Sequence, residues 1–167
     1  SEEWLEFLGR GGRDTVSFDV PMAGSVGPVP ESPHATPFGK AAMRREGGDL
    51  TIVSLAVGVH RALEAAQKLG DRDISCEVID LRSLRPLDVE TVVESVTKTG
   101  RLLVVDEDYR EFGLAGEMAA ICLEAGLSPR YARVCVEDTQ PYARHLEDAA
   151  LPNVTRIIEA ATALADA

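Results

Sequence analysis

Aromatic side chains are scarce in this chain of 167 residues, at only 5% of the composition. Hydrophobic residues nevertheless reach 45%, which is enough to build a core. Because so few aromatic rings are present, that core must consist of Val, Leu, Ile and Ala side chains. The length suits one domain of ordinary size with an additional segment at one end.

Basic residues are also few, with 17 Lys and Arg against 28 Asp and Glu and a net charge of −11. Proteins that bind nucleic acids or anionic membrane surfaces present basic faces to the phosphates. We therefore expect neither kind of partner. The sequence has no apolar run long enough to span a bilayer and no basic-then-apolar signal pattern at its start.

Cysteine is limited to three residues, Cys76, Cys122 and Cys135, which lie in apolar segments. They have no CxxC or other metal-binding spacing, and their odd number argues against a disulfide framework. The sequence predicts buried, reduced thiols, and reduced thiols favour a cytoplasmic location.

Glycine and proline gather near the start of the chain. Residues 1–37 hold five of the nine prolines, so neither a helix nor a central strand is expected to persist there. We expect an irregular arm or interdomain connector, with a short apolar group at Trp4, Leu5, Phe7 and Leu8. So long an irregular start favours a further domain before it or a partner chain that covers it.

Residues 38–167 alternate apolar runs of strand length with amphipathic stretches of helix length. The expected strands are residues 40–45, 50–56, 74–81, 101–106 and 131–136, and the expected helices are residues 58–70, 88–100, 114–125 and a last one from about Asn153. Such alternation predicts right-handed crossovers and a largely parallel sheet between helix layers, which is an α/β fold.

Ligands of such a sheet normally lie beyond the carboxyl ends of its strands. Arg82 and Arg85 follow one strand, and they would either clamp a carboxylate or phosphate or form ion pairs with acids such as Asp88 and Asp106. We favour the ion pairs, because no nucleophile or base adjoins the two arginines.

Three consecutive carboxylates, Asp106, Glu107 and Asp108, follow the next strand. They suggest a divalent-cation site, but consecutive side chains diverge and no metal-ligand spacing follows. A solvated or arginine-paired loop is the favoured interpretation.

The segment from Phe112 to Gly116 opens a helix as a phosphate cradle does, but it lacks the dinucleotide fingerprint and a Gly-Lys-Ser/Thr sequence. We expect Gly113 and Gly116 to permit close helix–sheet approach instead. His145 lies near the same edge, and we favour a surface or interface role over a general base, because no nucleophile motif such as GxSxG is present. The candidate residues for an anion site or an interface are Arg82, Arg85, Asp106, Glu107, Phe112 and His145.

Several short motifs occur in a characteristic order along residues 38–165. They are Phe38-Gly39-Lys40-Ala41, the run from Leu50 to Leu55, Ala62-Leu63-Glu64-Ala65-Ala66, the run from Ile79 to Asp88, Val104-Val105-Asp106-Glu107, the run from Phe112 to Ala120, and the run from Pro141 to Glu147 with Leu151-Pro152. Together they resemble the C-terminal domain of transketolase-like proteins, above all the beta subunit of the decarboxylating component of 2-oxo acid dehydrogenases (pyruvate, branched-chain and acetoin types). The resemblance implies a three-layer α/β/α domain whose five-stranded sheet is mostly parallel, with an antiparallel first strand.

The resemblance also implies that the parent enzyme oxidatively decarboxylates a 2-oxo acid with thiamine diphosphate and Mg²⁺ and transfers the acyl group to a lipoyl group. Those cofactors lie between two other domains, so no catalytic, cofactor-binding or metal-binding residue is implied on this chain. The implied role is dimerisation and docking, without autonomous catalysis. The implied partners are a second copy, the thiamine-binding domains or an alpha subunit, and the lipoyl acyltransferase core.

Two other functions stay open. A stand-alone regulatory or binding module would hold a small anionic ligand at the carboxyl ends of the strands through Arg82, Arg85 and His145. An independent flavodoxin-like enzyme is the least favoured alternative, because the phosphate loop is missing.

Overall fold

The computed structural model describes residues 31–32, 35–141 and 143–166. Most of the expected arm, residues 1–37, lies outside the described residues, and so do the apolar group at residues 4–8 and His34. Within the described part of the chain, no helix is long and apolar enough to cross a lipid bilayer.

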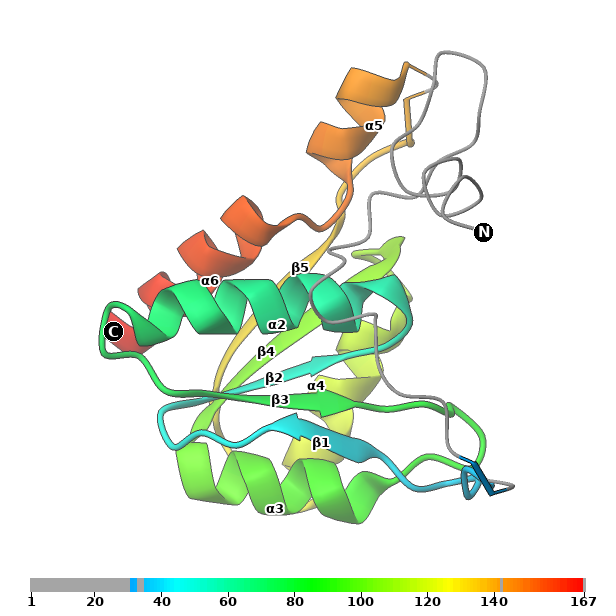
Figure 1. The fold of residues 1–167 in the computed structure, drawn as a ribbon, viewed down its shortest axis with the longest axis vertical. Helices are drawn as coiled ribbons and strands as arrows, with labels where there is room; N and C mark the ends of the chain where they lie inside the picture. Colours follow the sequence, from blue (N-terminus) through cyan, green and yellow to red (C-terminus); the bar gives the residue numbers. More distant parts are fainter. Residues whose placement is uncertain (1–30, 33–34, 142, 167) are drawn as a thin grey trace.

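Five strands form one mixed sheet in the order β1-β3-β2-β4-β5. They are β1 (Ala42–Arg45), β2 (Leu50–Ser54), β3 (Cys76–Asp80), β4 (Arg101–Tyr109) and β5 (Arg130–Val136). β1 pairs with β3 in antiparallel orientation, and the other neighbours are parallel. In Figure 1 the arrow of β1 therefore points against those of β2 and β3. The predicted sheet with an antiparallel first strand is confirmed, and its register shifts within β1 between Met43 and Arg45.

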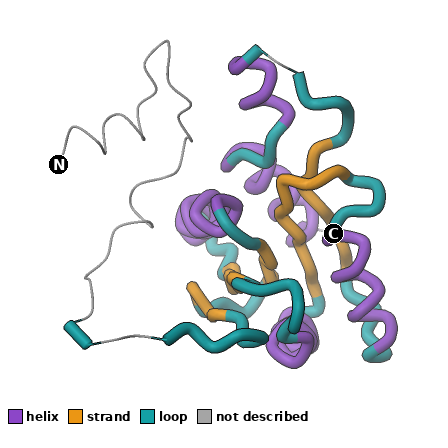
Figure 2. The backbone as a smooth tube through the Cα atoms, turned by 90° about the vertical axis from the view of Figure 1, so that its right-hand side faces the viewer, coloured by secondary structure: helices purple, strands orange, loops and turns teal. Residues whose placement is uncertain are grey.

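Helices cover both faces of the sheet (Figures 1 and 2). The helices α2 (Val57–Gly70) and α6 (Val154–Asp166) pack on one face, and α3 (Val89–Thr99) and α4 (Leu114–Glu124) pack on the other. All of β2 is buried, as expected for a central parallel strand that is covered on both sides. A further short helix, α5 (Arg144–Ala150), is missing from the sequence prediction and stands away from the sheet in Figure 1.

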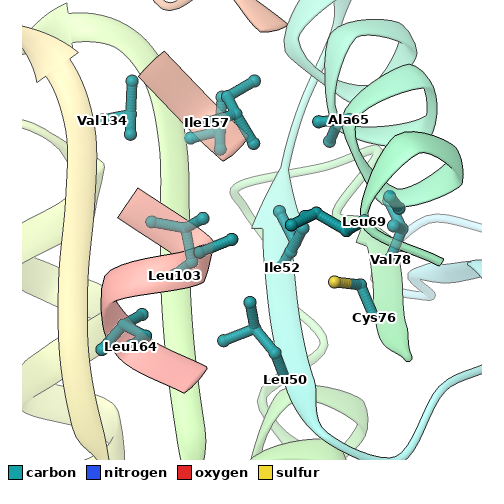
Figure 3. Close-up of a cluster of buried hydrophobic side chains, with 14 residues drawn as sticks. Leu50, Ile52, Ala65, Leu69, Cys76, Val78, Leu103, Val134, Ile157 and Leu164 are labelled. Atoms are coloured by element: carbon teal, nitrogen blue, oxygen red, sulfur yellow. The ribbon is translucent and has the colours of Figure 1, made fainter. Parts of the chain in front are cut away.

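The core is aliphatic, as the composition predicts, and it has two halves. One half lies between the sheet and α2 and α6, where Ile52, Leu69 and Leu103 are fully buried (Figure 3). The three cysteines are free and buried, and burial raises the pKa of Cys76 and of Cys135 to about 11. The prediction of buried thiols is confirmed.

A cluster of buried hydroxyl groups ties α3 to the central strand. Thr51 Oγ1 lies 2.6 Å from Ser95 Oγ and 2.7 Å from Thr99 Oγ1. All three residues are buried, so water cannot replace the hydrogen bonds that Thr51 makes to the other two hydroxyls. The cluster therefore fixes the position of α3 against β2.

Replacing Thr51 with valine should lower the free energy of unfolding by about 1–2 kcal/mol, because the shape is kept while two buried hydroxyls lose a partner. Urea denaturation followed by circular dichroism measures the change. Thr97→Val is the matched control, since Thr97 is exposed on the same helix. Equal effects of the two substitutions would contradict this account of the cluster.

Candidate functional site

The parallel strands all end at one edge of the sheet, which we call the carboxyl edge. In Figure 1 the arrows of β2 and β3 point to it. Central β2 has β3 on one side and β4 on the other. The connection from β2 to β3 therefore runs in one direction along the sheet, and the connection from β3 to β4 runs back past β2 in the other. Open α/β sheets bind their ligands at such a reversal. The segments that carry the predicted site residues follow or end these strands, so the carboxyl edge is the candidate site.

Backbone strain gathers at the carboxyl edge. Three residues other than glycine have positive φ there, with 48° at Ala56, 58° at Arg82 and 62° at Phe112. They follow β2, β3 and β4, respectively. The left-handed region is unfavourable for residues with a Cβ, and strain of this kind is common at functional sites.

The corner between β3 and α3 holds the segment that leads into β1. Ser83 Oγ accepts a hydrogen bond from the Gly39 N–H (3.0 Å) and donates one to the Pro86 carbonyl oxygen (2.8 Å). Asp88 Oδ2 accepts a hydrogen bond from the Ala41 N–H (3.0 Å). Ser83 is not among the residues that the sequence singles out as candidates. The sequence feature that indicates this role is a hydroxyl residue close to a turn-forming proline.

Asp88 caps α3, as predicted, by accepting hydrogen bonds from the Thr91 N–H (3.3 Å) and the Thr91 hydroxyl (2.9 Å). Burial favours its neutral form, but the hydrogen bonds from Ala41 and Thr91 and the nearby Lys40 ammonium outweigh burial and lower the pKa of Asp88. The carboxylate is therefore ionised at neutral pH and joins the segment that leads into β1 to the start of α3.

Arg82 and Arg85 do not form the ion pairs that we expected. Both side chains are exposed, and neither guanidinium is paired with a carboxylate of another described residue. Asp88 turns inward to Ala41 and Thr91 instead, and its cation is Lys40, whose Nζ lies 3.8 Å from Oδ1. Asp106 is buried beside its own loop rather than beside the arginines. The corner is therefore held by hydrogen bonds, and the two arginines stay exposed.

The three consecutive carboxylates diverge, as predicted. Asp106 is 7% exposed, and its Oδ1 accepts a hydrogen bond from the Asp108 N–H (3.2 Å). Its Oδ2 is buried and has no partner among the described residues. Burial raises the pKa of Asp106, and the negative charges of Asp108 and Glu107 add to the rise. Glu107 turns away and pairs with Arg61 at 2.6 Å, so the predicted arginine pairing is found there, but residues 106–108 belong to β4 and not to a loop.

A short aromatic loop, residues 109–113, joins β4 to α4. Its base is fixed to β5, because the Arg110 N–H donates to the Val136 carbonyl oxygen (2.8 Å) and Arg133 Nη1 donates to the Arg110 carbonyl oxygen (2.7 Å). The side chain of Phe112 is fully exposed, with a relative exposure of 108%, and Tyr109 is 48% exposed. The loop thus presents two aromatic rings to solvent from an anchored base.

The two glycines of this region behave differently. A Cβ at Gly113 would lie 2.3 Å from the carbonyl oxygen of Tyr109 in β4, so the predicted close approach of helix and sheet is confirmed there. A Cβ at Gly116 would meet nothing within 4 Å. The prediction is wrong for Gly116, because this residue faces outward on α4.

His145 belongs to α5 after β5, but its side chain lies outside the described residues. Its role as a base or an interface residue stays a prediction. Among the described residues, no group of three or more His, Cys, Asp or Glu side chains is placed to hold a metal ion.

The surface of the described residues includes two large grooves. The larger, of about 890 Å³, lies between the corner at residues 84–89 and α4, and the smaller, of about 610 Å³, lies between α2 and α6. Arg85 lines the larger groove, but so do Glu117 and Glu124 among mostly apolar residues. This groove is therefore poorly suited to clamp a small anion, because the two carboxylates oppose it.

Residues 39–157 match the protein family described as "Transketolase, C-terminal domain". Over 144 residues the chain is 42% identical to the beta subunit of acetoin:2,6-dichlorophenolindophenol oxidoreductase from Cupriavidus necator, and this match covers 84% of the chain and 43% of the relative. It is 40% identical over 148 residues to the beta subunit of the pyruvate dehydrogenase E1 component from Rickettsia conorii, with 86% of the chain and 43% of the relative covered. The chain therefore spans about two fifths of the length of these relatives.

Solved structures show the same architecture. A split-gene transketolase, described as an inactive beta4 tetramer, superposes with a TM-score of 0.72 at 28% identity, over 77% of this chain and 43% of that chain. A 2-oxoglutarate:ferredoxin oxidoreductase from Magnetococcus marinus shares only the fold, with a TM-score of 0.52 at 13% identity, over 75% of this chain and 19% of that chain.

Proposed function

Because the chain belongs to the transketolase C-terminal domain family, we propose that it is the assembly domain of a thiamine-diphosphate-dependent 2-oxo acid dehydrogenase. In this proposal the whole enzyme decarboxylates a 2-oxo acid and passes the acyl group to a lipoyl group. The domain, residues 38–167, supports dimerisation and docking of the lipoyl acyltransferase core. Residues 1–37 connect it to the thiamine-binding part of the parent protein.

The similarity to beta subunits carries the proposal. The relatives are named for two different substrates, acetoin and pyruvate, yet this part of their sequences resembles the chain to nearly the same degree. A domain that is shared between enzymes with different substrates suits a common task such as assembly. The choice of the 2-oxo acid then belongs to other parts of the enzyme.

In this proposal, other parts of the parent enzyme bind its cofactors, thiamine diphosphate and Mg²⁺. The described residues do not fit Mg²⁺, because they contain no cluster of carboxylate, imidazole or thiolate ligands. The proposed contribution of this chain is therefore to hold and orient its neighbours.

Two measurements on the purified chain test the proposal. Calorimetric titration with thiamine diphosphate and Mg²⁺ should give no binding heat, because the cofactor-binding domains are elsewhere, and the complete parent enzyme serves as the positive control. Light scattering should show self-association at high concentration. Tight, Mg²⁺-dependent binding or a clean monomer would contradict the proposal.

A binding module for a small anion is the alternative function. The observation that favours it is the exposure of Arg82 and Arg85 without an ion pair to another described residue. Pyruvate as the titrant in the same calorimeter distinguishes the two proposals. The assembly domain gives only the heat of dilution, whereas a binding module gives saturable heat that disappears in the Arg82→Ala, Arg85→Ala double variant.

A further inference from the structure

We propose that the aromatic loop, residues 109–113, is a docking surface whose anchor is Phe112. The phenylalanine ring inserts into an apolar pocket of a partner chain, and arginine or lysine side chains around that pocket face Asp108 and Glu111. The inference rests on the proposed function, because the partner is taken to be another chain of the parent enzyme.

The exposure and the backbone conformation of Phe112 are both unfavourable for the isolated domain. Its side chain is fully exposed and contributes nothing to either half of the core. Its φ of 62° belongs to the left-handed region, where glycine is favoured and a phenylalanine is strained. Strain that the fold does not need points to a role outside the fold.

The loop is also held in place before any partner arrives. Arg110 is bonded through both backbone groups, to Val136 and to Arg133, and Gly113 fits closely against the Tyr109 carbonyl. A partner therefore need not order the loop, which reduces the entropic cost of binding. Large aromatic side chains in such positions are typical anchors of protein interfaces.

The charges around Phe112 indicate the chemistry of the partner. Asp108 and Glu111 are exposed, and neither forms an ion pair with another described residue. The neighbouring Arg110 already has a carboxylate partner, because its Nη1 lies 3.5 Å from Glu137 Oε1. A basic rim complements this surface, whereas a second copy would bring like charges together in a chain of net charge −11.

The segment that leads into the domain and the aromatic loop lie on opposite sides of β2. The segment that leads into β1 is fixed at the β3–α3 corner by Ser83 and Asp88. That corner lies on the β1 and β3 side of β2, and the aromatic loop lies on the β4 and β5 side. Residues 39–41, the described part of that segment, therefore enter the domain on the opposite side of β2 from Phe112.

The test uses the complete beta polypeptide that contains this chain, titrated with the purified alpha subunit of the same enzyme. Phe112→Ala should weaken the association about 30-fold, as expected for an aromatic anchor. Glu111→Lys should also weaken it, and most at low salt. Leu123→Ala removes another exposed side chain (67%) at the far end of α4 and should leave the association unchanged.

The melting temperature of the domain distinguishes docking by Phe112 from a merely structural role. We expect Phe112→Gly to keep or raise the melting temperature of the domain, because it removes the strained φ, while it weakens the association as strongly as the alanine variant. If the wild type binds the alpha subunit and Phe112→Ala binds equally well, the docking surface is wrong and the proposed function stands. If the wild type does not bind the alpha subunit, the docking surface is also wrong, and the proposed function is decided by its own tests, the thiamine diphosphate titration and light scattering.

Discussion

Replacing Gly47 with alanine is expected to lower the free energy of unfolding by about 3 kcal/mol. A Cβ at this residue would lie 2.2 Å from the carbonyl carbon of Cys76 and 2.4 Å from the amide nitrogen of Glu77. Both atoms belong to the backbone of β3 and cannot rotate away. The turn between β1 and β2 would have to move, and with it the hydrogen bond from the Gly47 N–H to Glu77 Oε2 (3.4 Å).

The adjacent glycine supplies the control for this prediction. A Cβ at Gly48 would meet nothing within 4 Å, so Gly48→Ala should change the free energy of unfolding by less than about 0.5 kcal/mol. Thermal melts report the same contrast, with a fall of about 10 °C for Gly47→Ala alone. Similar melting temperatures for the two variants would show that the close contact at Gly47 is absent in solution.

Replacing Asp88 with alanine is the second substitution with a large expected effect, a loss of about 3 kcal/mol. The variant removes the cap of α3 and leaves the Ala41 N–H without its acceptor. Asp88→Asn keeps the shape and one acceptor, so we expect it to lose only about 1 kcal/mol. Urea denaturation at neutral pH compares both variants with the wild type. An alanine variant no less stable than the asparagine variant would contradict the structural role of Asp88.

The lowered pKa of Asp88 also fixes the sign of a pH effect. Its ionised form stabilises the fold above the ordinary aspartate pKa of about 3.9, and this contribution is lost as the pH falls through the lower pKa of the folded protein. The stability difference between the wild type and Asp88→Asn should therefore be constant at neutral pH and shrink below about pH 4. Glu77, whose pKa is also lowered, is present in both proteins, so its titration largely cancels. A difference that does not shrink in acid would refute the assignment.

The architecture could be predicted from the sequence because its signals are local. Apolar runs of strand length, the Asp88 cap and Gly100, which ends α3 with a φ of 65°, lie within single segments. The expected boundaries differ from the observed ones by a few residues at most. The largest difference is at the end of β4, which continues to Tyr109 through acidic residues for which the sequence predicted a loop. Pairing with β5 at Tyr109 and Val136 supplies the stabilisation that local sequence does not show.

The candidate site was less predictable because it depends on contacts between distant segments. The residue types suggested that Arg82 and Arg85 would form ion pairs with acids. The carboxylate of Asp88 instead accepts a hydrogen bond from Ala41, which lies 47 positions away in the sequence. Spacing cannot reveal such a contact. Phe112 was named as a candidate for an anion site or an interface, but the sequence could not show the full exposure of its ring, because an aromatic residue next to a helix start usually belongs to the core. Only the positive φ and the anchored base of its loop turn it outward.

The register shift in β1 has a consequence for how molecules of this protein meet one another. β1 is an edge strand whose outer backbone groups are not paired within the sheet, and such an edge is a template for intermolecular β-pairing and aggregation. The irregularity between Met43 and Arg45 interrupts that template, and the exposed Arg44 adds a charge to it. The β1 edge is therefore a poor seed for fibrils, and molecules of this protein that meet at this edge are expected to contact one another through side chains rather than through added strands.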